Sequence, residues 1–263
     1  MYYEKPRFID RFSSFCLINR RNASYRISMN IILIGSNGKT GRALIENMPE
    51  KHKIIRKIDT ENAENFFRET RKIADVLIDF SHRSLTKKII EYGLKTNTPL
   101  VIATTGQTED ELKLIENASR SLPIFKSGNV SSGIASLIES AKKIIANNSD
   151  CEVDVIDVHH DRKLDSPSGT ALLIAEKIRE VKGGNVVFEN VAGQRKKSDI
   201  ILHSLRYGNE FGTHRVIITT PNETIELKHT AMNRIIFAVG AIKAAEFIVN
   251  AQNGLYDVCD IKS

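Results

Sequence analysis

The chain has 263 residues, of which 41% are hydrophobic and 27% are charged, and it carries a net charge of +6. These values are typical of a globular protein and argue against extended disorder, and no run approaches 18 consecutive apolar residues, so no membrane-spanning helix is predicted. The positive charge forms no dense stripe interleaved with aromatic residues, and tryptophan is absent, so nucleic acid is not an expected partner.

Residues 1–28 show no sustained period of 2 or 3.6 residues, and they carry six basic residues against two acidic ones. Three interpretations stay open for this extension: an over-extended start with Met29 as the true initiator, an Arg-rich targeting peptide, or a disordered basic arm. We favour the first, because an apolar run typical of a first Rossmann strand begins directly after Met29. The extension lacks the apolar segment of a secretory signal.

Short apolar runs alternate with segments of helical spacing between residues 30 and 125. Strands are predicted at 30–34, 53–59, 74–80, 99–104 and 123–125, and helices at 42–48, 85–95 and 109–121. This βαβ order predicts a parallel sheet with helices on both faces. The fold class is therefore α/β, beginning with a Rossmann-type dinucleotide-binding domain over residues 29–130.

The first predicted strand is followed by glycines with the spacing G-x-x-G-x-x-G, from Gly35 to Gly41. Such a turn lets the backbone approach a pyrophosphate at the start of the next helix, although a plain βα loop is the alternative. Asp59 ends the second strand, where an acid hydrogen-bonds the adenosine ribose hydroxyls. We therefore expect NADH as the cofactor, while the nearby Arg56 and Lys57 leave NADPH open.

Three further loops of small and polar residues follow the later strands, at residues 80–82, 103–106 and 127–130. They stand at the carboxyl ends of parallel strands, which is the edge where ligands bind in such sheets. We expect all three loops to line the cofactor site.

The second half of the chain has a different pattern. Helices are predicted at 134–147 and 233–250, and strands with alternating polar and apolar residues at 151–159, 200–206, 214–219 and 224–229. Closely spaced strands of this kind indicate an antiparallel or mixed sheet. The sequence thus predicts an α+β domain with an open mixed sheet, followed by a short tail from Gly254.

A helix start lies within residues 159–171. Pro167 suits the first turn of a helix, with Asp165 or Ser166 as its N-cap. The backbone N–H groups of residues 168–170 would then be free to bind an anion such as a carboxylate.

Just before this helix start stand His159, His160 and Lys163. Histidine titrates near neutral pH and lysine adds a positive charge, so the segment is typical of a site that binds a carboxylate and moves a proton. A satisfied histidine at a strand end is the simpler interpretation of His159. Metal binding by His159, His160 and Asp161 is not favoured, because adjacent strand residues point to opposite faces and the spacing places no third ligand. No metal is expected.

The run His-His-x-x-Lys-x-Asp-x-Pro-Ser-Gly-Thr-Ala at residues 159–171 resembles the signature of the 4-hydroxy-tetrahydrodipicolinate reductases, also called dihydrodipicolinate reductases, of the diaminopimelate route to lysine. The resemblance spans residues 29–263. It also includes the glycine loop, residues 103–106, Asn129, residues 204–206 and His229. The chain departs from the family at Ala103, where a glycine is usual, and at Ser166, where an alanine is usual.

The resemblance implies an NAD(P)H-dependent reductase acting on a small dicarboxylate. It implies that His159 donates the proton and that Lys163 assists it. The implied substrate ligands are His160, Ser168, Gly169 and Thr170. The implied cofactor contacts are Gly35, Ser36, Asn37, Gly38, Lys39, Thr40, Asp59, Ala103, Thr104, Thr105, Ser127, Gly128, Asn129 and Val130.

The resemblance further implies a homotetramer, with residues 131–234 binding substrate and forming the oligomer while residues 235–263 pack back on the cofactor domain. The three cysteines are far apart and form no CxxC, which favours a reducing cytoplasm over a disulfide framework. Two alternatives remain: another two-domain NAD(P)-dependent oxidoreductase, and a dinucleotide sensor without catalysis. Whether Arg234 touches substrate stays open.

Overall fold

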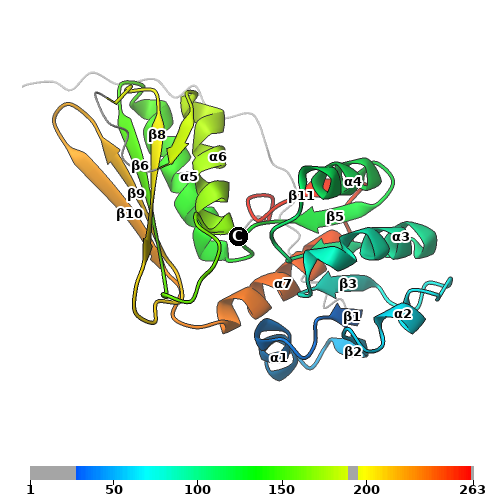
Figure 1. Cartoon of the computed structure of the whole chain (residues 1–263). Helices are drawn as coiled ribbons and strands as arrows, with labels where there is room; N and C mark the ends of the chain where they lie inside the picture. The colour runs from blue at the N-terminus through cyan, green and yellow to red at the C-terminus, as the bar shows by residue number, and fades with distance from the viewer. Residues whose placement is uncertain (1–27, 189–194, 262–263) are drawn as a thin grey trace, which may run out of the picture.

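The computed structural model describes residues 28–188 and 195–261, so the predicted extension lies outside the described residues apart from Ser28. Two sheets lie side by side and the chain crosses between them twice (Figure 1). The first sheet is wholly parallel, in the order β11-β5-β4-β3-β1-β2. Its strands are β1 (Asn30–Ile34), β2 (Lys53–Ile58), β3 (Val76–Asp79), β4 (Leu100–Ile102), β5 (Pro123–Lys126) and β11 (Gly254–Tyr256).

Helices cover both faces of this sheet, which explains why its central strands are apolar without alternation. Ile31 and Leu33 pack against α1 (Lys39–Glu46) and α7 (Ile235–Ile248). Ile32 and Ile34 belong to the core on the opposite face. That core is completed by α2 (Ala63–Phe66), α3 (Thr86–Thr96), which follows the short helix η1 (Arg83–Leu85), and α4 (Glu109–Ser119).

The second sheet is mixed, in the order β10-β9-β6-β8-β7. Its strands are β6 (Glu152–His159), β7 (Val186–Phe188), β8 (Ile200–Arg206), β9 (Thr213–Thr219) and β10 (Thr224–Thr230). The helices α5 (Ser132–Asn147) and α6 (Gly169–Lys182) pack on one face of it and close a separate core around Val153 and Val155. No helix of the described ranges is long and apolar enough to cross a membrane.

The predicted α/β class with a parallel sheet and a second mixed sheet is confirmed. The helix start at residues 159–171 was placed wrongly: α6 begins at Gly169, and Ser168 is its N-cap, not Asp165 or Ser166. Pro167 therefore stands before the cap and not in the first turn. The sequence pattern did not indicate α2, β7 or β11, each of which is only three or four residues long.

Candidate active site

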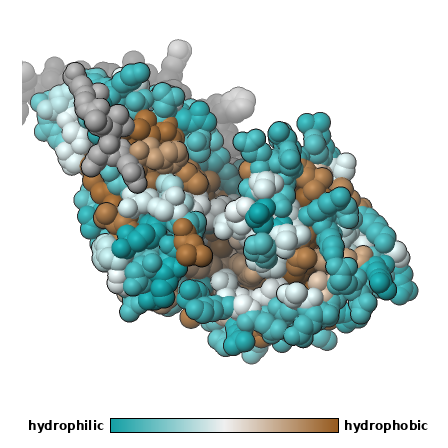
Figure 2. Space-filling model, in the orientation of Figure 1, coloured by the Kyte–Doolittle hydropathy of each residue, from teal (hydrophilic) through white to brown (hydrophobic). Residues whose placement is uncertain are grey.

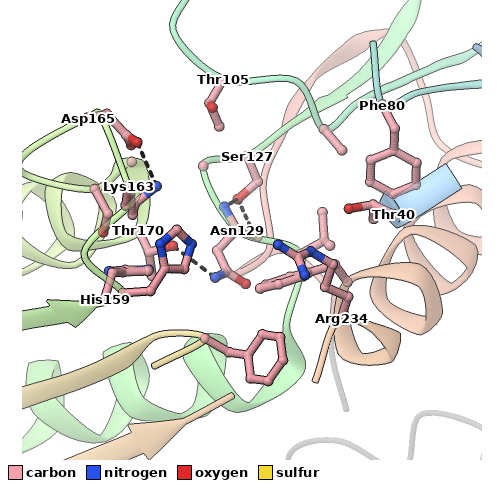
Figure 3. Close-up of a pocket in the computed structure, with 18 residues that line it drawn as sticks. Thr40, Phe80, Thr105, Ser127, Asn129, His159, Lys163, Asp165, Thr170 and Arg234 are labelled. Carbon is pink, nitrogen blue, oxygen red and sulfur yellow. Dashed lines mark hydrogen bonds and ion pairs between the residues drawn. The ribbon is translucent and has the colours of Figure 1, made fainter. Parts of the chain in front are cut away.

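A cavity of about 310 Å³ lies between the two halves of the molecule, where the surface is hollowed in Figure 2. Thr40, Thr105 and Ser127 approach it from the first sheet, and His159 and Lys163 from the second (Figure 3). The cavity brings together most of the predicted site residues: Thr40, Ala103, Thr105, Ser127, Gly128, Asn129, Val130, His159, His160, Lys163, Ser168, Gly169 and Thr170.

The glycine loop after β1 is shaped for close backbone approach. Gly35 has φ +81°, and a Cβ on it would lie 2.5 Å from the carbonyl oxygen of Phe80. A Cβ on Gly41 would lie 2.2 Å from the carbonyl oxygen of Gly35. The N-cap of α1 is Gly38, so no side chain caps the helix, and its first turn holds no acid. Its N-terminal amides are therefore available to a phosphate group.

Asp59 organises this loop from the end of β2. It accepts a hydrogen bond from the Ser36 hydroxyl, and the Asn37 backbone N–H donates to its Oδ1 at 3.0 Å. Together with Gly35 and Gly38 it lines a second cavity, of about 330 Å³. Gly35, Gly38 and Asp59 could therefore hold part of a dinucleotide cofactor.

Two charged residues that the sequence analysis missed lie under the cofactor loops. Asp79, at the end of β3, is fully buried, and burial raises its pKa although Ser81 donates hydrogen bonds to it. Lys126 ends β5, and its Nζ donates to the Thr104 carbonyl oxygen at 3.1 Å. Burial lowers the pKa of Lys126 to about 8, and the charge of Asp79 opposes that shift. Lys126 thus holds the loop after β4, and Asp79 holds the loop after β3 through Ser81. Of the remaining predicted cofactor contacts, Asn37 and Lys39 are exposed and lie outside both cavities, and Ser36 and Thr104 are buried outside them.

The N-terminus of α6 forms one wall of the cavity. The Ser168 hydroxyl accepts a hydrogen bond from the Ala171 backbone N–H at 3.2 Å, and the Ser168 backbone N–H donates to Asp157 Oδ2 at 2.9 Å. Ser168 is thus already engaged by its neighbours. The backbone N–H groups of Gly169 and Thr170 have no acceptor among the described residues, so they are the free anion-binding groups of this helix end.

His159 ends β6 with its ring lining the cavity, and its Nδ1 lies 2.9 Å from Asp157 Oδ1. The ring is therefore not buried among aliphatic side chains. Lys163 comes from the following loop, and its Nζ donates to Asp165 Oδ1 at 2.7 Å. His160 also faces the cavity, and desolvation followed by the charge of Arg162 lowers its pKa. Lys163 and His160 can together bind a carboxylate, and His159 can supply a proton beside them.

Asp157 is the centre of a buried polar cluster. His214, on the neighbouring strand β9, places its Nε2 3.2 Å from Asp157 Oδ1, and Arg206 Nη2 donates to Oδ2 at 3.0 Å. Burial alone would raise the pKa of this carboxyl, but the adjacent imidazoles of His159 and His214 and the hydrogen bonds donated by Ser168 hold its pKa well below the usual range. The cluster is thus built around an ionised carboxylate.

Asp157, His159 and His214 offer possible ligand atoms within 4.8 Å of one another, so the fold supplies the third candidate metal ligand that spacing did not place. The Arg206 guanidinium donates to the same carboxylate, and a fixed positive charge in the cluster disfavours a cation there. We interpret the cluster as a hydrogen-bonded network. Asp157 and His159 lie two residues apart on β6, so their side chains share one face of the strand. Their proximity could therefore have been predicted from the sequence.

Asn129 joins the two walls. Its Nδ2 donates to the Thr170 hydroxyl at 2.9 Å, and its Oδ1 accepts from the Ser131 backbone N–H at 2.7 Å. Arg234, at the start of α7, also lines the cavity, with its guanidinium 5.6 Å from the centre of the Phe211 ring. The loop that leaves the first sheet is therefore tied directly to the anion-binding end of α6.

A dinucleotide loop on a parallel sheet, facing a second sheet that carries an anion-binding helix end and a histidine, defines a two-domain nicotinamide-dinucleotide-dependent oxidoreductase. The family model for the N-terminus of dihydrodipicolinate reductase matches residues 29–130, and the model for its C-terminus matches residues 133–261. The chain belongs to the dihydrodipicolinate reductase family, whose members are NAD(P)H-dependent reductases of lysine biosynthesis.

Curated relatives agree over nearly the whole length. The 4-hydroxy-tetrahydrodipicolinate reductase of Rickettsia canadensis is 41% identical over 235 residues, which cover 89% of this chain and 98% of the relative. The enzyme of the same name from Exiguobacterium sibiricum is 39% identical over 233 residues, covering 86% and 93%.

Solved structures confirm the fold. A dipicolinate-bound dihydrodipicolinate reductase from Paenisporosarcina sp. TG-14 superposes with a TM-score of 0.69 at 20% identity, covering 88% of this chain and 98% of that one. An amine dehydrogenase from Mycobacterium smegmatis reaches a TM-score of 0.61 at 9% identity, covering 89% and 96%. The fold is thus shared by enzymes with other substrates, and the substrate must be argued from the site.

Proposed function

We propose that this chain reduces 4-hydroxy-tetrahydrodipicolinate to tetrahydrodipicolinate, with His159 as the proton donor and Lys163 as its assistant. The observation that carries the proposal is the cavity itself. One wall is formed by the loops after the parallel strands, and the other by the free amides of Gly169 and Thr170 beside a histidine and a lysine. A dianionic ring fits such a wall because helix N-termini and ammonium groups both favour negative charge.

A bound NAD(P)H supplies the hydride. The amides of Gly169 and Thr170, with Lys163 and His160, hold the carboxylates so that the imine of the ring faces the nucleotide loops. The hydroxyl first leaves as water together with a proton from the neighbouring ring carbon, which gives the conjugated imine. Addition of hydride to this imine then leaves electron density on the ring. His159 supplies the proton that this density requires, because an imidazole exchanges protons near neutral pH.

We further propose NADH as the preferred nucleotide. Asp59 stands at the ribose end of the loop, where it accepts from Ser36 and Asn37, and a carboxylate there repels a 2′-phosphate. The predicted contacts Gly35, Ser36, Asn37, Gly38, Lys39 and Thr40 would hold the pyrophosphate and ribose. The predicted contacts Ala103, Thr104, Thr105, Ser127, Gly128, Asn129 and Val130 would hold the nicotinamide half.

We also propose the predicted domain division and assembly. Residues 29–130 with 235–263 would bind the nucleotide, and residues 131–234 would bind substrate and form a homotetramer. Among the described residues, no helix packs on the β6 face that carries Asp154 and Ile156, which leaves that face for another subunit. Light scattering on the purified protein tests this, since a monomer would contradict it. The thiols of Cys151 and Cys259 are free, and we infer a reducing cytoplasm.

A coupled assay tests the function directly. The substrate is generated in the cuvette immediately before use, and the loss of nucleotide absorbance is followed with NADH and NADPH separately. We expect turnover with both and a higher kcat/KM with NADH. Nucleotide binding without turnover would support a dinucleotide sensor instead, and turnover only with another small acid would support a different oxidoreductase.

A further inference from the structure

The strand that carries His159 also carries a carboxylate on the same face. Asp157 lies two residues earlier on β6, and alternate residues of a strand point to one side. Its Oδ1 is 2.9 Å from His159 Nδ1, and the Asp157 side chain has no exposed surface. The family resemblance gives Asp157 no role, and the proton transfer proposed above does not use it directly.

Groups from two other elements hold this carboxylate still. From the cap of α6, the Ser168 backbone N–H donates to Oδ2 at 2.9 Å and the Ser168 hydroxyl to Oδ1 at 2.8 Å. From the end of β8, Arg206 Nη2 donates to Oδ2 at 3.0 Å. The carboxylate is therefore ionised and fixed in orientation, and it presents Oδ1 to the imidazole as a preorganised acceptor.

The other titratable groups around the pair do not replace Asp157. His214 faces it from β9, but burial lowers the pKa of His214, so this second imidazole is neutral near pH 7 and adds no competing charge. The remaining charged or titratable groups are Lys163, His160 and Asp165 in the loop after β6, Arg206 on β8 and Arg234 before α7. Asp165 is the one acid among these five, and its Oδ1 accepts a hydrogen bond from Lys163 Nζ at 2.7 Å.

Gly212 lies beside the opposite edge of the His159 ring, where it places no side chain against Nε2. A Cβ on Gly212 would lie 2.9 Å from His159 Nε2, and the φ of Gly212 is +150°. Any larger residue would therefore press on the nitrogen that lies away from Asp157. Because Nδ1 is buried against the carboxylate, Nε2 is the ring nitrogen left to serve the cavity that His159 lines.

We infer that Asp157 is the positioning residue of His159: its carboxylate accepts the Nδ1 proton, directs Nε2 to the cavity, and stabilises the imidazolium. The inference rests on the proposed role of His159. During transfer, the Nε2–H bond breaks and its proton passes to the ring of the substrate, while the Nδ1–H bond and the charge of Asp157 are unchanged. The neutral imidazole that remains is the Nδ1–H tautomer.

The tautomer can be observed without any turnover. Protein labelled with ¹⁵N-histidine is compared by NMR with the Asp157→Asn variant, at a pH where His159 is neutral. We expect the Nδ1–H form in the wild type and a shift toward the Nε2–H form in the variant, because an amide can donate to Nδ1. An unchanged tautomer in the variant would overturn the inference. A wild type that never turns over would refute the proposed function alone, since the spectra still report the tautomer.

Kinetics then separate positioning from general damage. Asp157→Asn is expected to lower kcat on the order of 100-fold, as for loss of a general acid, with KM and the NADH Kd changed less than about 3-fold. The alkaline limb of its kcat/KM profile should move to lower pH, because the imidazolium has lost its partner. Added to His159→Gln, the same substitution should lower kcat no further, since both act through one group. A further loss would overturn the inference.

Asp154 offers a matched control on the other face of β6. Its Oδ1 also lies close to a histidine, with His203 Nε2 3.0 Å away, but Asp154 does not line the cavity. Asp154→Asn should keep the wild-type kcat, and an equal loss there would contradict a specific role. If Asp157→Asn does not fold, Asp157→Glu takes its place in the double-mutant cycle. The displaced carboxylate should lower kcat about 10-fold when His159 is present. In the His159→Gln background, Asp157→Glu should leave kcat unchanged.

Discussion

Gly128 lies where a cofactor loop packs against the start of the substrate helix. A Cβ there would lie 2.6 Å from the Gly169 carbonyl oxygen and 3.1 Å from its carbonyl carbon, and both are backbone atoms that cannot turn aside. Ordinary contact begins at 3.4 Å, so Gly128→Ala must separate the two walls by about 0.8 Å. The conformation of Gly128 itself suits an alanine, so the clash is the whole perturbation.

Misplacement of reacting groups by about 1 Å costs up to about 100-fold in rate, which corresponds to about 2.7 kcal/mol of activation free energy. We therefore expect Gly128→Ala to lower the single-turnover rate of nucleotide oxidation by tens of fold to 100-fold. NADH affinity should fall by less than the rate, because Gly128 is one of many proposed nucleotide contacts. Stopped-flow absorbance and a fluorescence titration measure the two quantities.

Gly254→Ala is the matched control. Gly254 lies in β11 away from the cavity, and a Cβ there meets only the flexible ring of Tyr256, at 3.3 Å. The Gly254→Ala enzyme should turn over at close to the wild-type rate. A Gly128→Ala enzyme that reacts within about 3-fold of the wild type would refute the argument that the spacing between the two walls sets the rate.

Three further predictions concern single charges. Lys163→Ala removes the ammonium from the substrate wall, so steady-state assays should show a raised KM and a lowered kcat; unaltered kinetics would remove Lys163 from the site. Asp59→Ala should weaken NADH more than NADPH in fluorescence titrations, because the ribose acceptor is lost, and an unchanged ratio of Kd values would contradict the ribose argument. Burial lowers the pKa of Lys126 from 10.5 to about 8, so between these values the unfolded chain binds more protons and wild-type stability rises with pH. Relative to Lys126→Met, the free energy of unfolding should therefore gain up to about 3 kcal/mol between pH 7 and 10.5 in urea titrations, and a difference that does not vary with pH would refute this.

Much of the fold was visible in the sequence because its physical causes are local. The run Ile31–Ile34 is apolar at every position, since helices cover both faces of the parallel sheet, and its length separates it from a helix. The three residues of β11 have no such pattern. They form a strand only because β5 offers a free edge beside them, in the register Leu255 to Ile124.

The site residues likewise divide into those that the sequence indicated and those that only the fold brings together. His159 and Lys163 stand in one short segment, so their residue types alone predicted anion binding and proton transfer. His214 was missed because it meets Asp157 only through strand pairing: the two residues lie directly opposite each other in the β6·β9 register. The N-cap was misplaced for a related reason, since several polar residues precede α6 and the buried carboxylate selects Ser168.

The most direct test of the account is the single-turnover rate of His159→Gln with freshly generated substrate and saturating NADH. Glutamine fills most of the imidazole's space but cannot donate a proton at neutral pH, so we expect the rate to fall about 100- to 10,000-fold while the NADH Kd is unchanged. A His159→Gln enzyme that oxidises NADH at close to the wild-type rate would contradict the assignment of the proton donor.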